Sequence, residues 1–145
     1  MVTPVTVGRA DVFPRGGQDQ LSVSINPGEV TGASLQKDGS VFNGSGFISS
    51  IIVSGYAKND GTDIAAASRD VATFIGTMLI DGVAIGNLGT LELSQLDGDE
   101  NGNVKDSIVV PVNKYFSTSV QPRLTAIKGD HSVIGGSLRV NVLTD

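Results

Sequence analysis

The sequence predicts an all-β fold, a jelly-roll β-sandwich of about eight to ten antiparallel strands with an extended N-terminal arm. The first observation is glycine content, 19 of 145 residues, without a fixed period or a low-complexity tract. The second is a set of Asp-Gly and Asn-Gly dipeptides, which supply the positive φ angles of tight hairpin turns. They are Asp38-Gly39, Asn43-Gly44, Asp60-Gly61, Asp81-Gly82, Asp97-Gly98 and Asn101-Gly102. The third is an apolar/polar alternation of period two between these turns.

Three segments show this alternation. The first is LSVSI at Leu21 to Ile25, and the last is SLRVNVL at Ser137 to Leu143. In PRLTAI, the pattern places Leu124 and Ala126 on one face of a strand. Each segment therefore predicts a strand with one face in a core.

Two longer segments lie between them. SGFISSIIVSGYA, from Ser45 to Ala57, is long enough for a central strand, and we expect a bend at Gly55. FIGTMLIDGVAIG, from Phe74 to Gly86, reads as two arms of a hairpin joined by a two-residue loop at Asp81-Gly82. The only predicted helix is a short one from Asp63 to Asp70, where Asp63 would be the N-cap.

This many strands require two packed sheets or a closed barrel, because a single open sheet would leave an apolar face in water. A jelly roll is our first choice. An immunoglobulin-like sandwich is the second, although the chain has neither tryptophan nor cysteine. We expect Phe47, Phe74 and Phe116 to fill the core.

Length and composition predict one domain, residues 20–145, preceded by an arm at residues 1–19. The arm contains prolines and glycines but no sustained alternation, which is typical of a segment that docks on a partner. The start lacks a secretory signal and no apolar run is long enough to span a membrane, so we expect a soluble protein, complete from Met1, with no membrane partner. The net charge is −5 and the ten basic residues are scattered, so we expect no nucleic acid partner.

No motif predicts catalysis or a cofactor. The single histidine, His131, lies between Asp130 and Ser132, but a hydrolytic triad is assembled from positions that are distant in sequence. No pair of carboxylates has an apolar neighbourhood that would raise one pKa. We therefore expect a protein that is not an enzyme and that binds no cofactor.

One loop resembles the start of a calcium site. Asp97, Asp99 and Asn101, followed by Gly102, have the spacing of an EF-hand loop. The twelfth position, where a bidentate glutamate should complete the coordination, is Ile108. We favour a polar hairpin tip over a metal site and leave calcium as the alternative.

The acidic, cysteine-free chain, with its arm and the segments GFISSIIVSGY and FIGTMLIDGVAIG, resembles the jelly-roll decoration (cement) proteins of tailed-phage capsids. The resemblance implies a structural protein, made in the host cytoplasm, that lies on the outer capsid surface of the virion as a homotrimer. It would clamp neighbouring major capsid protein subunits and stabilise the capsid. Arg9 and Arg15 of the arm are our candidate capsid contacts, since arginine recognises carboxylates with two hydrogen bonds.

Two other functions are open. The chain could be a receptor- or glycan-binding domain of a phage fibre, but sugar sites are usually lined by exposed aromatic side chains, and Tyr56 and Tyr115 are the only tyrosines. It could also be a small jelly-roll capsid subunit, which would assemble into closed shells.

Overall fold

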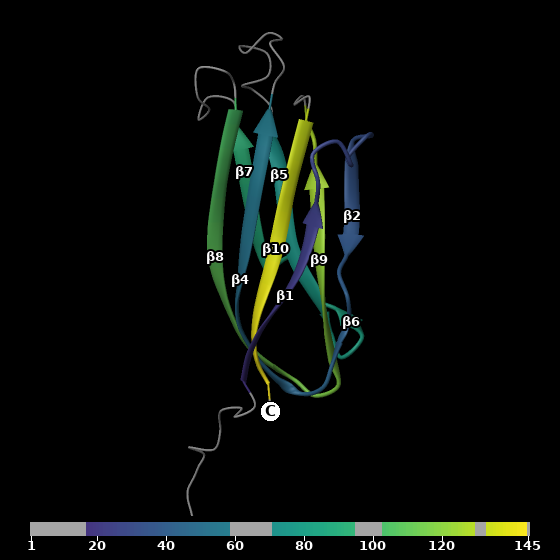
Figure 1. Cartoon of the computed structure of the whole chain (residues 1–145), viewed down its shortest axis with the longest axis vertical. Coiled ribbons are helices and arrows are strands. Elements are labelled where there is room, and N and C mark those ends of the chain that lie inside the picture. The colour runs from purple at the N-terminus through teal and green to yellow at the C-terminus, as the bar shows by residue number, and fades with distance from the viewer. Residues whose placement is uncertain (1–16, 59–70, 95–102, 130–132, 145) are drawn as a thin grey trace, which may run out of the picture.

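The computed structural model describes residues 17–58, 71–94, 103–129 and 133–144, and strands make up 78% of them. The described strands form two antiparallel sheets that face each other (Figure 1). Sheet A contains, in spatial order, β1 (Gly17–Ile25), β10 (Val133–Thr144), β4 (Gly46–Lys58) and β8 (Asn103–Phe116). Sheet B contains β2 (Ser34–Asp38), β9 (Ser119–Ile127), β5 (Val71–Ile80) and β6 (Val83–Ala84), with β3 (Phe42–Asn43) beside β9 and β7 (Gly89–Ser94) beside β5.

The order of the strands identifies the topology. β1 pairs with β10, β2 with β9, β4 with β8 and β5 with β7, so each early strand pairs with a correspondingly late one. This nested pairing, distributed over two sheets, is a jelly roll. The predicted fold class is confirmed. The immunoglobulin-like alternative is wrong, because its sheets contain neighbours that are consecutive in sequence, whereas no two strands of sheet A are consecutive.

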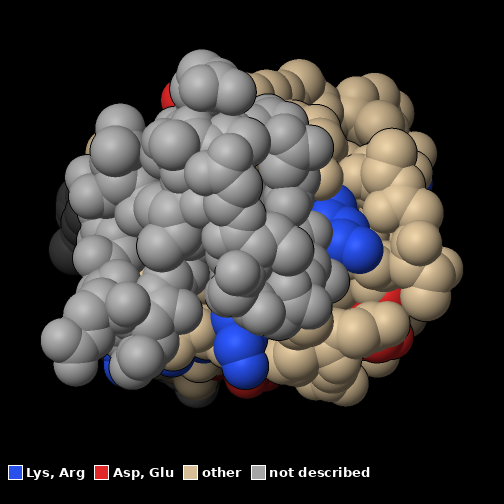
Figure 2. Space-filling view, turned by 90° about the horizontal axis from the view of Figure 1, so that it is seen from above, with Lys and Arg blue, Asp and Glu red and all other residues tan. Residues whose placement is uncertain are grey.

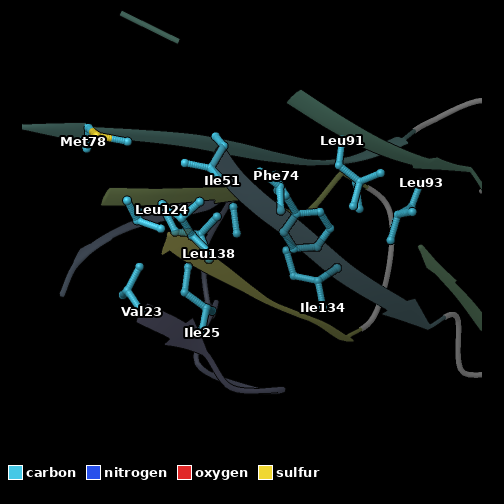
Figure 3. Packing of buried hydrophobic residues seen from close by; sticks show 14 of the residues in the cluster. Val23, Ile25, Ile51, Phe74, Met78, Leu91, Leu93, Leu124, Ile134 and Leu138 are labelled. Carbon is cyan, nitrogen blue, oxygen red and sulfur yellow. The ribbon is translucent and has the colours of Figure 1, made fainter. Parts of the chain in front are cut away.

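The core lies between the sheets and is built from alternate residues of long strands such as β5 and β9, as the period-two pattern predicts. The Phe74 side chain of sheet B is buried among apolar side chains of both sheets (Figure 3). It lies over two glycines of sheet A, where an added Cβ would be 2.6 Å from its ring at Gly55 and 2.8 Å at Gly136. These glycines thus make room for the ring.

Gly55 does not mark the irregularity predicted in the long central strand. Its pairing with Asp106 is in register with the pairs on either side, and the register shift lies between Ile48 and Ser50. No bulge lies at Gly55. A glycine is needed there because the Phe74 ring leaves no room for a Cβ atom.

Gly39 was predicted as a turn glycine, but its φ angle is not positive. A Cβ at Gly39 would be 2.8 Å from both the Pro122 side chain and the Ser22 carbonyl oxygen.

Two of the three predicted core phenylalanines are in the core. Phe74 and Phe116 are buried, but Phe47 is only partly buried and lies on the outer face of sheet A. Ile48 is fully buried, so its neighbour Phe47 must point the other way. Its ring packs at 60° against Tyr115, with 4.8 Å between ring centroids.

The hairpin predicted at Asp81-Gly82 is confirmed. β5 ends at Ile80, β6 begins at Val83, and both turn residues have positive φ angles, 53° and 81°. The Asp81 carboxylate accepts hydrogen bonds from the backbone amides of residues 117–119 at 2.7 to 3.1 Å and from the hydroxyls of Ser117 and Thr118. These bonds, the Thr118 amide first, hold the pKa of Asp81 far below its usual range. They tie the β5–β6 turn to the turn between β8 and β9.

Several predicted features lie outside the described residues. These are the helix at Asp63 to Asp70, the loop with Asp97, Asp99 and Asn101, the single His131, and Arg9 and Arg15. β1 begins at Gly17, so the last three residues of the predicted arm pair with β10, while the boundary at residue 19 stays a prediction. The described residues contain no helix, and hence none with the length and apolarity to cross a membrane.

Candidate functional site

The outer face of sheet A carries a row of serines that no single segment of the sequence reveals. Ser24 of β1 pairs with Ser137 of β10, which pairs with Ser54 of β4, which pairs with Ser107 of β8. Neighbouring strands are about 4.8 Å apart, so this serine row crosses the sheet over about 14 Å. Within the described residues, none of the four hydroxyls has a hydrogen-bond partner.

The serine row forms part of a groove of about 600 Å³. The groove is bordered by Pro27, which follows β1, by Tyr56 near the end of β4, and by Lys105 near the start of β8. Gly135 leaves no side chain in it, and a Cβ there would be 3.1 Å from the Pro27 ring. We call this feature the serine groove.

The serine groove lies toward the upper end of sheet A in Figure 1, where β4 ends and β8 and β10 begin. Figure 2 looks onto that end of the molecule. On the described surface visible there, Lys and Arg side chains and Asp and Glu side chains are both present, and neither kind forms a continuous patch.

A second feature lies below the serine row, on β4 and β8. The outward positions of the two strands carry the pair Ile52 and Val109, then Pro111 opposite Ser50, then the pair Phe47 and Tyr115. Val109 is 66% exposed and Tyr115 is 57% exposed. Valine is a residue type that is usually buried. We call these residues (Phe47, Ile52, Val109, Pro111 and Tyr115) the apolar band.

Beside the apolar band, in the row of Ser50 and Pro111, polar side chains connect the strands of sheet A. The Gln20 amide donates to Asn141 Oδ1 at 2.9 Å, and the Asn141 amide donates to Ser50 Oγ at 3.0 Å. On the same face, Arg139 pairs with Ser22 and Ile52, and its buried Nε has no hydrogen-bond partner within the described residues. The hydrogen bonds link three adjacent strands, β1, β10 and β4, across the outer face of sheet A.

The described residues contain no group of three or more His, Cys, Asp or Glu side chains arranged to hold a metal ion. The one carboxyl group with a large pKa shift among them, Asp81, is held by structural hydrogen bonds in a turn. The expectation that the chain is not an enzyme stays a prediction.

The structure separates the two tyrosines that the sequence offered for a sugar site. Tyr56 borders the serine groove and Tyr115 lies in the apolar band at the other end of the same face. Sequence reasoning missed the serine row because its four members come from four strands and align only through the register. The alternating serines of LSVSI were the only local signal.

No protein-family model matches the chain, and no curated protein matches its sequence. Among solved structures, it is similar to dimeric latent PorU from Porphyromonas gingivalis (TM-score 0.46, 10% identity), where the match covers 89% of this chain but only 13% of PorU. It is also similar to a Cowpea Mosaic Virus empty virus-like particle (TM-score 0.42, 10% identity, 98% of this chain and 84% of that chain). A third similar structure is the C-terminal CBM6 of LamC from Zobellia galactanivorans (TM-score 0.37, 14% identity, 86% of this chain and 99% of that chain). None of the three is a phage decoration protein.

Proposed function

We propose that this chain is a structural protein of a virion that decorates and stabilises a phage capsid by binding across neighbouring major capsid protein subunits as an oligomer. The observation that carries the proposal is the apolar band. Contiguous exposed apolar side chains on a small domain are typical of a surface that another protein covers. Val109 and Tyr115 of the band are well exposed and lie on β8, which is an edge strand of sheet A.

The band is suited to a protein partner. A buried aromatic pair contributes strongly to an interface, and Phe47 and Tyr115 already hold each other in one arrangement. Ordering them on binding would cost little conformational entropy. A capsid lattice presents the same partner surface many times, so an oligomer, which we expect to be a homotrimer, would bind it with multivalent gain.

The N-terminal arm is the second proposed contact. β1 begins at Gly17, which pairs with Thr144 at the lower end of sheet A in Figure 1, and residues 1–16 come before it in the sequence. An extended chain of this length spans up to about 55 Å, enough to reach a neighbouring subunit. Arg9 and Arg15 would bind carboxylates of that subunit.

Co-sedimentation with capsids that lack the protein tests the apolar band. We expect the double variant Val109→Ser, Tyr115→Ser to lose about tenfold or more in affinity, because two anchoring side chains are removed. Ile127→Ser is the matched control, since Ile127 is an exposed apolar residue (38%) of sheet B. We expect it to bind as the wild type does. Equal binding by the double variant and the control would contradict the role of the band.

Deletion of residues 1–16 tests the arm and spares β1, which begins at Gly17. We expect a folded body by circular dichroism and much weaker capsid binding, because every subunit of the oligomer loses its arm. Full capsid binding by the deleted form would overturn the role of the arm. A monomeric full-length protein with no capsid affinity would overturn the decoration function, and assembly into closed shells would identify a capsid subunit instead.

A further inference from the structure

We propose that the serine groove is a binding site for a neutral oligosaccharide. This site is separate from the apolar band, and it goes beyond attachment to a capsid. The inference depends on the chemistry of the groove floor, on the aromatic side chain at its border, on its charge and on its position over paired strands.

The floor offers hydroxyl groups with free hydrogen-bonding capacity. Each serine hydroxyl can donate one hydrogen bond and accept two, and the described residues use none of this capacity at Ser24, Ser54, Ser107 or Ser137. The hydroxyls repeat at the strand spacing of about 4.8 Å. That repeat is close to the length of one pyranose ring along an extended chain, so successive sugar rings would meet successive serines.

The border offers an aromatic ring. Tyr56 lies on the same outward row as Gly135 and Lys105, one row from the serines, and its side chain is only partly buried. The C–H face of a sugar ring packs on an aromatic face while its hydroxyls reach polar groups at the side. A phenol next to a row of free hydroxyls provides both kinds of contact.

The charge of the groove favours a neutral ligand. Lys105 and Asp106, adjacent on β8, line the groove with opposite charges. No second cation lines it among the described residues, so an anionic polymer would find little net attraction. The volume of about 600 Å³ is within the range of small-molecule sites, roughly 300–1,000 Å³, and accommodates a short oligosaccharide.

The position of the groove argues against a peptide strand. A peptide that adds to a sheet needs an edge with unpaired backbone groups. The middle of the groove floor belongs to β10 and β4, and each of these strands is paired on both sides. Recognition there must go through side chains, as it does for sugars.

Titration calorimetry of the full-length protein with cellotriose, maltotriose and laminaritriose tests the proposal, with trigalacturonic acid and a Gly-Ser hexapeptide as comparison probes. We expect saturable binding of at least one neutral trisaccharide, and weaker binding of both comparison probes. We expect Ser54→Ala with Ser137→Ala to weaken binding by about tenfold, since two hydrogen bonds are lost. Ser22→Ala with Ser34→Ala is the matched control, because both serines are exposed on strands and neither lines the groove.

Ser107→Trp provides a second variant that places a large side chain in the groove from an exposed edge-strand position, where an aromatic residue is compatible with a strand. We expect it to abolish trisaccharide binding, with an unchanged circular dichroism spectrum. No binding of any neutral trisaccharide would overturn the proposal. So would equal affinity of the groove variants and the control pair, or a preference for the hexapeptide or the charged trisaccharide. Capsid binding by the protein with Ser54→Ala and Ser137→Ala would be unchanged, because neither residue belongs to the apolar band, and this separates the test from that of the decoration function.

Discussion

The two sheets share one core, but their outer faces carry different features. On sheet B, the Arg123 guanidinium makes two hydrogen bonds to Asp38, at 2.7 and 3.0 Å, and the Gln121 amide donates to the Gly39 carbonyl at 2.8 Å. The Thr77 hydroxyl is also within hydrogen-bond distance of the Ile85 and Gly86 carbonyls. Polar side chains of β9 and β5 are thus bonded to β2 and to the residues that follow β2 and β6.

The outer face of sheet A has a side-chain hydrogen-bond network at Gln20, Asn141 and Ser50. The serine row lies two rows above this network and has no hydrogen-bond partner within the described residues. The apolar band runs past the network on β4 and β8. Groups that a fold leaves without partners contribute little to its stability but remain free for a ligand. Both features that we propose as binding surfaces, the serine groove and the apolar band, therefore lie on sheet A.

We expect the largest loss of stability from a substitution at the contact between the two sheets. Phe74→Ala should lower the free energy of unfolding by about 3–5 kcal/mol, because it removes the ring that packs on glycines of the opposite sheet. Urea titrations followed by circular dichroism and by tyrosine fluorescence should both shift, with one coincident transition. Two separate transitions would show that the sheets unfold independently. They would contradict the single shared core on which the comparison depends.

We expect a smaller loss of stability from a substitution of Asp81, which links the β5–β6 turn to the turn between β8 and β9. Asp81→Asn should lower the melting temperature at neutral pH, since the amide replaces a carboxylate that accepts bonds from three backbone amides. The pKa of Asp81 is lowered in the folded protein, so its stabilisation is complete above the unfolded pKa, about 3.9, and declines as the pH falls from there toward the folded pKa. Melting curves between neutral pH and strong acid should show a smaller acid-dependent fall for Asp81→Asn than for the wild type. Equal falls would assign the acid sensitivity to other carboxylates.

The ion pair between Arg123 and Asp38 on sheet B should contribute less to stability. Hydrogen bonds from Arg123 lower the pKa of Asp38, but the side chains are 23% and 36% exposed, so water and salt screen the pair. We expect Asp38→Asn to lower the melting temperature slightly at low ionic strength and by even less at high salt. Melting curves at two salt concentrations check this. A loss as large as that of Asp81→Asn would show that sheet B depends on its outer face more than its exposure indicates.

The smallest effect on stability is expected on sheet A. Ser54→Ala with Ser137→Ala should change the free energy of unfolding by no more than about 0.5 kcal/mol per substitution, because the hydroxyls have no partner to lose within the described residues. Urea unfolding measures it. A clearly larger loss would show that the serine row supports the fold, and would remove the contrast between the two faces.

Much of the fold could be predicted because local chemistry decides it. Alternation at Leu21 to Ile25 and at Leu124 and Ala126 determines which side chains enter the core, and both patterns hold in the structure. The Asp81-Gly82 hairpin depends on two φ angles that this dipeptide adopts readily. The assignment of Phe47 to the core failed because residue type outweighed strand period in the prediction, although the neighbouring Ile48 already indicated the opposite face.

The sequence by itself determined the all-β class, the two-sheet sandwich and most strand positions, since alternation and turn residues act over a few neighbouring positions. Only the tertiary structure decided that Gly55 and Gly136 meet Phe74, and that Ser24, Ser137, Ser54 and Ser107 form one row. These contacts join residues from strands that are distant in sequence. Strand register sets them, and a shift of one residue would turn every serine to the other face of the sheet.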